Sequence, residues 1–426
     1  MPPFIHRSVR PHDCPDSCGL LVTVNAGRAV HVTGDAAPSD SPTRETGIRS
    51  TTTWWSSAPP NPPDVESRKP DCSLVVPLLN EAETIRKFLL MLARQERIDF
   101  QVILSDGGSR DDTLLRAKAL GELLPYDLTI ITGGRGRGRQ MNSGAAVAQG
   151  DWLLFIHADS KFSDPLALYK GLSAVKEREV AKGEGRTAGR FAIRFDTAGA
   201  SSGFGYSFCE GKARLNRSGC ILGDQGFLLS RKLLERVGSF DESLTVAEDP
   251  DFAERLRAHG EFILLPAEIL SSPRRFVMEG YRSRQTLNAL LMGLLFSGHS
   301  SFLATLPGSY QRHDRARRLS LEPIFREIAR LISTLPMRKR LLFWYKIGAY
   351  VRGNIWQLAF ALDLWRTRRG GVEGALLALY DKYLDRLTNH PPGRLLVAGI
   401  VWLWFFSARR WRWLREGKRE DVKRAG

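Results

Sequence analysis

Residues 100–113 of this 426-residue chain are Phe-Gln-Val-Ile-Leu-Ser-Asp-Gly-Gly-Ser-Arg-Asp-Asp-Thr, an apolar run of strand length followed by a polar turn with two glycines. The same pattern repeats across residues 71–266, where apolar runs (73–77, 100–104, 128–131 and 152–156) alternate with segments of helical length (83–95, 112–124 and 140–149). This order predicts an α/β fold with a mostly parallel sheet and helices on both faces. Ligands of such sheets bind beyond the carboxyl ends of the strands, so the polar residues there are the candidate site.

Four polar motifs follow the expected strands, at residues 77–81, 105–113, 133–144 and 157–160. In this order they resemble the catalytic domain of glycosyltransferase family 2, which has the Rossmann-like GT-A fold and uses nucleotide-sugar donors. The resemblance covers residues 71–266. The sequences of residues 136–144, 155–160 and 223–226 are similar to those of a bacterial subgroup of this family, which is associated with arsenosugar biosynthesis and radical-SAM genes. The expected activity is therefore a hexosyltransferase-like glycosyl transfer.

The resemblance assigns the first two motifs to the nucleotide of the donor. The residues it implies are Pro77, Asn80, Glu81, Asp106, Gly107 and Gly108. Local chemistry leaves another interpretation open, in which Asp106 begins an Asp-Gly-Gly turn and Ser109 or Asp111 caps the next helix. Asn80 could equally cap the helix that follows it.

The third motif is a glycine-rich loop with three arginines that opens onto an expected helix. Arginine forks and exposed amides at a helix start both favour phosphate. The donor-binding residues implied here are Arg137, Arg139, Asn142 and Gly144. A solvated arginine loop is the alternative.

The fourth motif, His157-Ala-Asp159, stands where the family has its Asp-x-Asp metal motif. Asp159 is the expected ligand of Mg²⁺ or Mn²⁺, because such sites often combine one protein carboxylate with substrate phosphates. Histidine replaces the first aspartate, so His157 either contacts the ligand or supports the site. A polar strand end in which Asp159 caps a turn is the alternative.

The catalytic residues implied by the resemblance are Glu248 and Asp249, with Asp249 as general base. One base without a second nucleophile implies a single displacement, with inversion at the anomeric carbon. Asp249 followed by Pro250 is also a typical helix N-cap, and both interpretations can hold together. The residues expected at the acceptor are Asp224, Gln225, Arg274 and Arg275.

Charge divides the chain unevenly. Residues 1–267 hold 33 basic and 34 acidic residues, whereas residues 268–426 hold 29 and 12. Residues 267–426 are expected to be basic and helical, with an apolar run at 395–408 too short to span a membrane comfortably. Such helices commonly lie on anionic membrane surfaces. A packed helical domain is the main alternative, and nucleic acid is not expected because no known motif accompanies the charge.

The N-terminal residues predict a separate module. Residues 1–37 contain a β-hairpin pattern and resemble the iron–sulfur segment of molybdopterin oxidoreductases, but Cys14 and Cys18 lack the other two ligands, so a cluster is not expected. A redox protein and a catalytically silent nucleotide-sugar-binding protein are the alternative functions. Residues 38–70, rich in Ser, Thr and Pro, predict a disordered linker. Five cysteines and the absence of a signal pattern favour the cytoplasm, with peripheral attachment to the inner face of the membrane as a further expectation.

Overall fold

The computed structural model describes residues 4–9, 19–25, 28–34, 69–197, 203–244, 247–299, 302–303, 319–370, 372 and 374–424. Within these ranges, side chains are described between residues 69 and 410, apart from the side chain of Arg275. The chain divides into two compact units, Met1–Glu66 and Ser67–Gly426.

The first unit contains a three-stranded antiparallel sheet. Its strands are β1 (Phe4–Val9), β2 (Gly19–Asn25) and β3 (Arg28–Gly34), in that order. β1 was not expected from the sequence. The expected linker at 38–70 lies outside the described residues except for residues 69 and 70, and so do Cys14 and Cys18.

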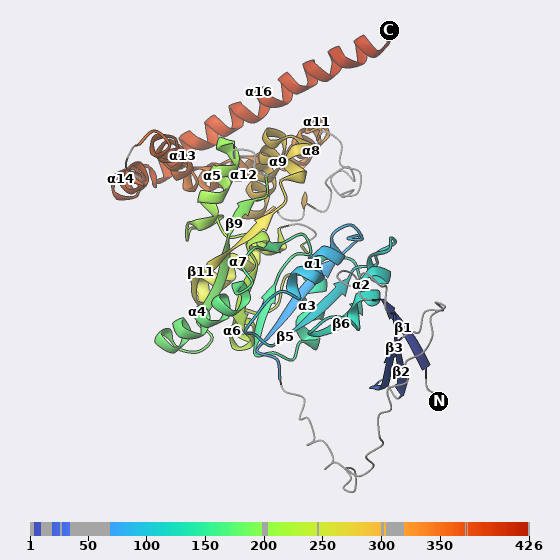
Figure 1. The fold of residues 1–426 in the computed structure, drawn as a ribbon. Coiled ribbons are helices and arrows are strands. Elements are labelled where there is room, and N and C mark those ends of the chain that lie inside the picture. The colour runs from blue at the N-terminus through green and yellow to red at the C-terminus, as the bar shows by residue number, and fades with distance from the viewer. Residues whose placement is uncertain are drawn as a thin grey trace, which may run out of the picture. The chain divides into compact units, whose positions relative to one another are not determined.

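The second unit is built on an eight-stranded mixed sheet with the order β6-β5-β4-β7-β10-β9-β11-β8. Figure 1 labels β5, β6, β9 and β11 of this sheet. Its strands are β4 (Cys72–Leu78), β5 (Phe100–Asp106), β6 (Asp127–Thr132), β7 (Trp152–Phe155), β8 (Lys161–Phe162), β9 (Thr187–Phe195), β10 (Phe227–Ser230) and β11 (Glu261–Ser271). β4, β5, β6 and β7 are parallel, which confirms the expected order. β10 runs antiparallel to both β7 and β9, so the second half of the sheet is less parallel than expected.

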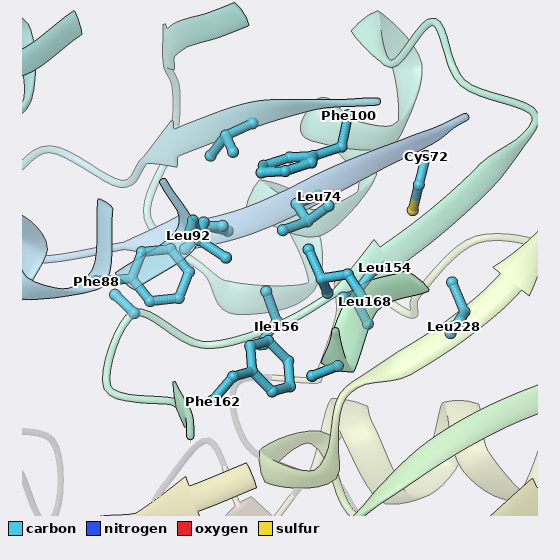
Figure 2. Packing of buried hydrophobic residues seen from close by; sticks show 14 of the residues in the cluster. Cys72, Leu74, Phe88, Leu92, Phe100, Leu154, Ile156, Phe162, Leu168 and Leu228 are labelled. Atoms are coloured by element: carbon cyan, nitrogen blue, oxygen red, sulfur yellow. The ribbon is translucent and has the colours of Figure 1, made fainter. Parts of the chain in front are cut away.

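Helices cover both faces of this sheet. They are α1 (Ile85–Leu92), α2 (Thr113–Gly121), α3 (Arg137–Val147), α4 (Ala167–Lys182), α6 (Arg231–Val237) and α7 (Glu248–His259), and this part also contains α5 (Phe204–Arg214) and η1 (Gly223–Gln225). Neighbouring residues of a strand point to opposite faces, so β4 contributes to two buried clusters. Leu74 and Val76 join the cluster with α1, α2 and α4, whereas Val75 joins the cluster with α3, α6 and α7. Figure 2 shows part of the first cluster, where Phe88 of α1 and Leu154 of β7 contribute to the same core.

The C-terminal part is mainly helical, as expected. Its described helices are α8 (Arg274–Glu279), α9 (Tyr281–Phe296), α11 (Glu322–Thr334), α12 (Met337–Gly353), α13 (Trp356–Thr367), α14 (Ala375–Leu379), the π-helical η3 (Tyr380–Leu384), α15 (Asp385–Thr388) and α16 (Pro391–Arg424). A third buried cluster joins α9, α11, α12 and α16. β11 continues to Ser271 and pairs with β9, so the sheet crosses the domain boundary predicted at residue 266.

One described helix is long and apolar enough to cross a membrane by length and composition. It is the segment Pro391–Arg410 of α16, with a mean hydropathy of 1.2. This differs from the expectation that no such span is present, because the helix continues without a break through the arginines that bound the apolar run at 395–408.

Candidate active site

The predicted site residues meet at one edge of the sheet for a topological reason. The parallel strands β4, β5, β6 and β7 all end there. β10 is antiparallel to β7, so its amino end, preceded by Asp224 in η1, lies at the same edge. The edge therefore gathers residues from both halves of the sheet, which the spacing of the motifs alone did not show.

A buried carboxylate pair lies at the start of α7. Arg137 Nη1 is 3.0 Å from Glu248 Oε1 and 3.2 Å from Asp249 Oδ2. The Glu248 and Asp249 side chains are only 4% and 9% exposed, whereas Arg137 is 39% exposed. The arginine thus joins a buried acidic pair to the solvent-facing glycine-rich loop.

Two further residues lie close to Asp249. A Cβ atom on Gly223 would overlap the Asp249 carboxylate, so a larger residue at position 223 would require this side chain to shift. His157 Nε2 lies 3.9 Å from the same oxygen. Asp249 Oδ1 is buried without a hydrogen-bond partner among the described residues, so a ligand could be its partner.

Burial and like charge shape the electrostatics of this pocket. Burial, followed by the charge of Asp249, raises the pKa of Glu248 to about 7, although Arg137 acts in the opposite direction. Burial also raises the pKa of Asp224 to about 7, with added contributions from Asp249 and Asp159. Carboxylates that hold protons near neutral pH are typical of acid–base sites, although buried ion-pair networks show such shifts too.

The helix start differs from the N-cap expected at Asp249. Ala247 occupies the N-cap position in the left-handed region, with φ of 69°, and Asp249 is the second residue of α7. The N-cap interpretation of Asp249 is therefore wrong. Its carboxylate remains in the first helical turn, where the helix dipole favours negative charge.

The first two motifs form a hydrogen-bonded double loop. The backbone N–H groups of Gly108 and Ser109 donate to the Asp106 carboxylate at 2.9 and 3.0 Å. Asn80, with φ of 56°, accepts from the Arg110 N–H at 2.9 Å. Thr84, not Asn80, is the N-cap residue of α1. These contacts agree with the turn interpretation of Asp106, and its contact with a nucleotide stays a prediction.

Gln140 is a structural residue of the site to which sequence reasoning gave no role. It is buried, and its Nε2 donates to Leu78 O at 2.6 Å and Ser105 O at 2.7 Å, which ties together the ends of β4 and β5. A Cβ on Gly107 would lie 2.9 Å from Gln140 Oε1. Its position after the glycine-rich loop was the only signal in the sequence.

Glu242 is a second residue that the sequence analysis missed. Its carboxylate accepts from Arg139 Nε at 3.0 Å and from Asn142 Nδ2 at 3.0 Å. Asn142 also accepts the Phe240 N–H and donates to Phe240 O. The Asn142 amide therefore holds the segment before α7, and contact with a nucleotide would need these bonds to change.

Gly144 lies inside α3 and not at its start, where the resemblance placed it. A Cβ there would lie 2.4 Å from Val75 Cγ1, in the core beneath β4. We expect Gly144→Ala to lower the free energy of unfolding by about 1–3 kcal/mol, because a β-branched neighbour in a packed core cannot easily move. Urea denaturation measures this.

Two variants control that experiment. Gly133→Ala, at a glycine with no atom within 4 Å of the added Cβ, should be nearly neutral. Val75→Ala should recover part of the loss when combined with Gly144→Ala. A Gly144→Ala protein as stable as the wild type would contradict the close approach.

The remaining predicted site residues differ in how they face solvent. Asp159 is exposed after β7, whereas Gln225 is fully buried and donates to Ala213 O at 2.8 Å. Arg274 is exposed and pairs with Glu83 at 3.2 Å, and the side chain of Arg275 lies outside the described residues. Gln225 can therefore meet an acceptor only if the surrounding chain moves.

The residues at this edge fit a divalent cation that binds together with the phosphates of a substrate. In the described part of the chain no group of three His, Cys, Asp or Glu side chains is arranged to hold a metal. Asp159 is exposed near Asp224, one of whose oxygens is buried without a hydrogen-bond partner among the described residues. One carboxylate together with substrate phosphates suffices for Mg²⁺ or Mn²⁺, so these residues fit a metal that arrives with the donor.

The shifted pKa of Asp224 makes stability depend on pH. Between pH 4 and pH 7 the folded state holds a proton that the unfolded state releases, so stability falls as pH rises through this range. We expect Asp224→Asn, which removes this penalty, to raise Tm relative to the wild type at pH 8 and not at pH 4. Thermal melts in EDTA measure the difference.

Asp241→Asn is the matched control for that effect. The Ser243 hydroxyl and N–H hold the pKa of Asp241 below its usual value, so its loss should lower Tm slightly at pH 8. Equal Tm differences for Asp224→Asn at pH 4 and pH 8 would contradict the raised pKa.

Acidic and basic side chains gather beyond the strand ends of this mixed α/β sheet, which is where ligands of α/β sheets bind. The family model described as "Glycosyl transferase family 2" matches residues 73–237. These 165 of the 426 residues are similar to that family, and the mixed α/β sheet with its helices is consistent with the GT-A fold. Glu248 and Asp249 lie beyond the matched segment.

The chain is also similar to curated proteins over part of its length. It is 36% identical over 116 residues to the "PGL/p-HBAD biosynthesis glycosyltransferase" of Mycobacterium bovis (strain BCG / Pasteur 1173P2) and, to the same extent, to that of Mycobacterium tuberculosis (strain ATCC 25177 / H37Ra). The match covers 26% of this chain and 43% of each relative, so the chain spans less than half the length of these relatives.

Solved structures resemble the chain loosely. The mannosyltransferase PcManGT from Pyrobaculum calidifontis, in complex with GDP-Man and Mn²⁺, has a TM-score of 0.41 at 16% identity, covering 79% of this chain and 88% of that one. S. aureus TarS has a TM-score of 0.39 at 16% identity, covering 67% of this chain and 52% of that one.

Proposed function

We propose that this chain is an inverting glycosyltransferase, which moves a sugar from a nucleotide-sugar donor to a hydroxyl group of an acceptor. The observation that carries the proposal is the buried Glu248–Asp249 pair, which Arg137 joins to the glycine-rich loop of a family 2 domain. The same proposal has four further parts. The acceptor is a lipid or a small molecule, and the transferred sugar is a hexosyl group. The protein attaches to the inner face of the membrane and belongs to the arsenosugar-associated subgroup.

The proposed reaction is a single displacement. The acceptor oxygen attacks the anomeric carbon while the bond from that carbon to the diphosphate oxygen breaks, and the electron pair leaves with the diphosphate. Asp249 takes the proton of the acceptor hydroxyl, because its second oxygen is buried without a described partner. Attack from the side opposite the leaving group inverts the anomeric configuration.

Arginines and a metal would stabilise the leaving group. Arg137 and Arg139 open α3 next to the sheet edge, where guanidinium groups can contact the two phosphates. Asp159 would hold Mg²⁺ or Mn²⁺, which when bound stabilises the charge that develops on the diphosphate. Glu248 keeps Arg137 close to the catalytic aspartate.

The test is release of nucleoside diphosphate from a panel of nucleotide sugars, with Mg²⁺, Mn²⁺ or EDTA present, and with or without membrane lipid extract. We expect one donor to be used, and EDTA to abolish its use. Isothermal titration without acceptor measures donor binding separately. No binding of any donor in the presence of metal would refute the proposal.

A further inference from the structure

The apolar residues of α16 face two different environments. On one side Ala398 and Phe405 are buried against α11 and α12, where a Cβ on Gly348 would lie only 2.6 Å from Ala398. On the other side Leu396, Ile400 and Leu403 are 68%, 57% and 60% exposed. Their spacing of four and three residues places these three side chains on one face of the helix.

We define the outer face of α16 as Leu395, Leu396, Ile400, Trp402 and Leu403, all of which are exposed. A soluble helix normally has a polar face opposite the packed one, because exposed apolar surface is unfavourable in water. No described residue covers this outer face. Contiguous apolar surface of this kind marks an interaction site for a protein or a membrane.

The charges at the ends of the apolar run indicate which of these partners fits. Arg394 precedes the run and Arg409 and Arg410 follow it, and residues 391–410 contain no acidic residue. Arginines at both ends of an apolar helix can reach lipid phosphates while their stems stay in apolar surroundings. Trp402, 44% exposed, belongs to the residue type enriched at the boundary between headgroups and acyl chains.

Packing favours an orientation parallel to the membrane. The segment Pro391–Arg410 is long and apolar enough to cross a bilayer by length and composition, so length does not decide the orientation. The other side of the helix is packed on α11 and α12, so lipid cannot surround it. A helix with one lipid-facing side lies in the membrane interface and does not cross it.

We propose that the outer face of α16 docks the protein onto an anionic lipid bilayer, with the helix lying in the plane of the interface. This deepens the proposed membrane attachment by naming the surface and the class of lipid. It is independent of glycosyl transfer, because vesicle binding needs neither donor nor acceptor. A second copy of this chain is the competing occupant.

The experiment is flotation of the full-length protein with vesicles of phosphatidylcholine alone or of phosphatidylcholine mixed with phosphatidylglycerol. We expect the wild type to float with the anionic vesicles. The outer-face variant, with Leu396→Glu, Ile400→Glu and Leu403→Glu, should lose at least tenfold in affinity. An Arg394→Gln, Arg409→Gln and Arg410→Gln variant should lose the preference for anionic vesicles, by roughly a hundredfold.

A matched variant controls for surface charge. Leu115→Glu, Leu123→Glu and Val180→Glu replace apolar residues of the α/β part that are at least as exposed, and they should leave flotation unchanged. Circular dichroism and thermal melts establish that each variant is folded. Wild type that fails to float, or a folded outer-face variant that floats equally well, would overturn the proposal. So would a dimer by light scattering that the outer-face variant disrupts without any vesicle binding.

Discussion

The Asp249→Asn variant is expected to lose roughly 10²–10⁴-fold in kcat, with donor affinity nearly unchanged, because general-base catalysis contributes on that scale. Asparagine keeps the shape of the side chain but cannot accept the acceptor's proton. The measurement is steady-state release of nucleoside diphosphate with the donor identified in the panel, together with titration of the donor.

Asp251→Asn controls for the loss of a negative charge in the first turn of α7. Asp251 pairs with Arg255 at 2.9 Å instead of joining the Glu248–Asp249 pair, so its replacement should change kcat little. An Asp249→Asn protein with kcat within threefold of the wild type would exclude Asp249 as the base while leaving the proposed glycosyl transfer intact.

Arg137→Gln is expected to weaken nucleoside diphosphate binding roughly 10- to 100-fold, the scale of one charge-assisted contact. A second effect follows from its contacts with the buried pair. If the diphosphate draws Arg137 away, the pKa of Glu248 rises further, because this arginine lowers it. Wild-type protein at pH 7 should then take up part of a proton for each diphosphate bound.

Titration calorimetry in buffers of different ionisation enthalpy measures this proton uptake. Charged and titratable groups that surround the pair come from α3 (Arg137), the end of β7 (His157 and Asp159) and η1 (Asp224). Arg139→Gln is the matched control, since Arg139 pairs with exposed Glu242. It should lose affinity but retain the uptake, whereas Arg137→Gln should lose both. Equal proton uptake by the wild type, Arg137→Gln and Arg139→Gln would contradict the idea that the diphosphate draws Arg137 away from Glu248 and Asp249.

The alternating first half of the sheet was predictable because each strand is a short apolar run and each motif follows it directly. β4, β5, β6 and β7 appear where the sequence places them. β10 was not assigned, because its antiparallel direction depends on pairing with β7 and β9 and not on local composition. Strand direction of this kind is a tertiary property that one sequence does not display.

The partners of the site residues were less predictable than their location. The resemblance implied that Arg137 and Asp249 belong to one site, but not that they pair, since they are far apart in the chain. It assigned Asn142 to the donor, whereas the amide is occupied by Phe240 and Glu242. Where a side chain has several possible partners, tertiary packing determines which one it pairs with, and a local sequence pattern does not show this.

The pairing of β7 with β10 also bears on when the candidate site is completed during synthesis. The loops proposed to hold the donor follow β4, β5 and β6, which adjoin one another early in the chain. β10 and α7, which bring Asp224 and the Glu248–Asp249 pair, leave the ribosome later, and they belong to the same sheet and core, which fold as one unit. The proposed donor loops and the proposed base would therefore form together, only after α7 has been synthesised.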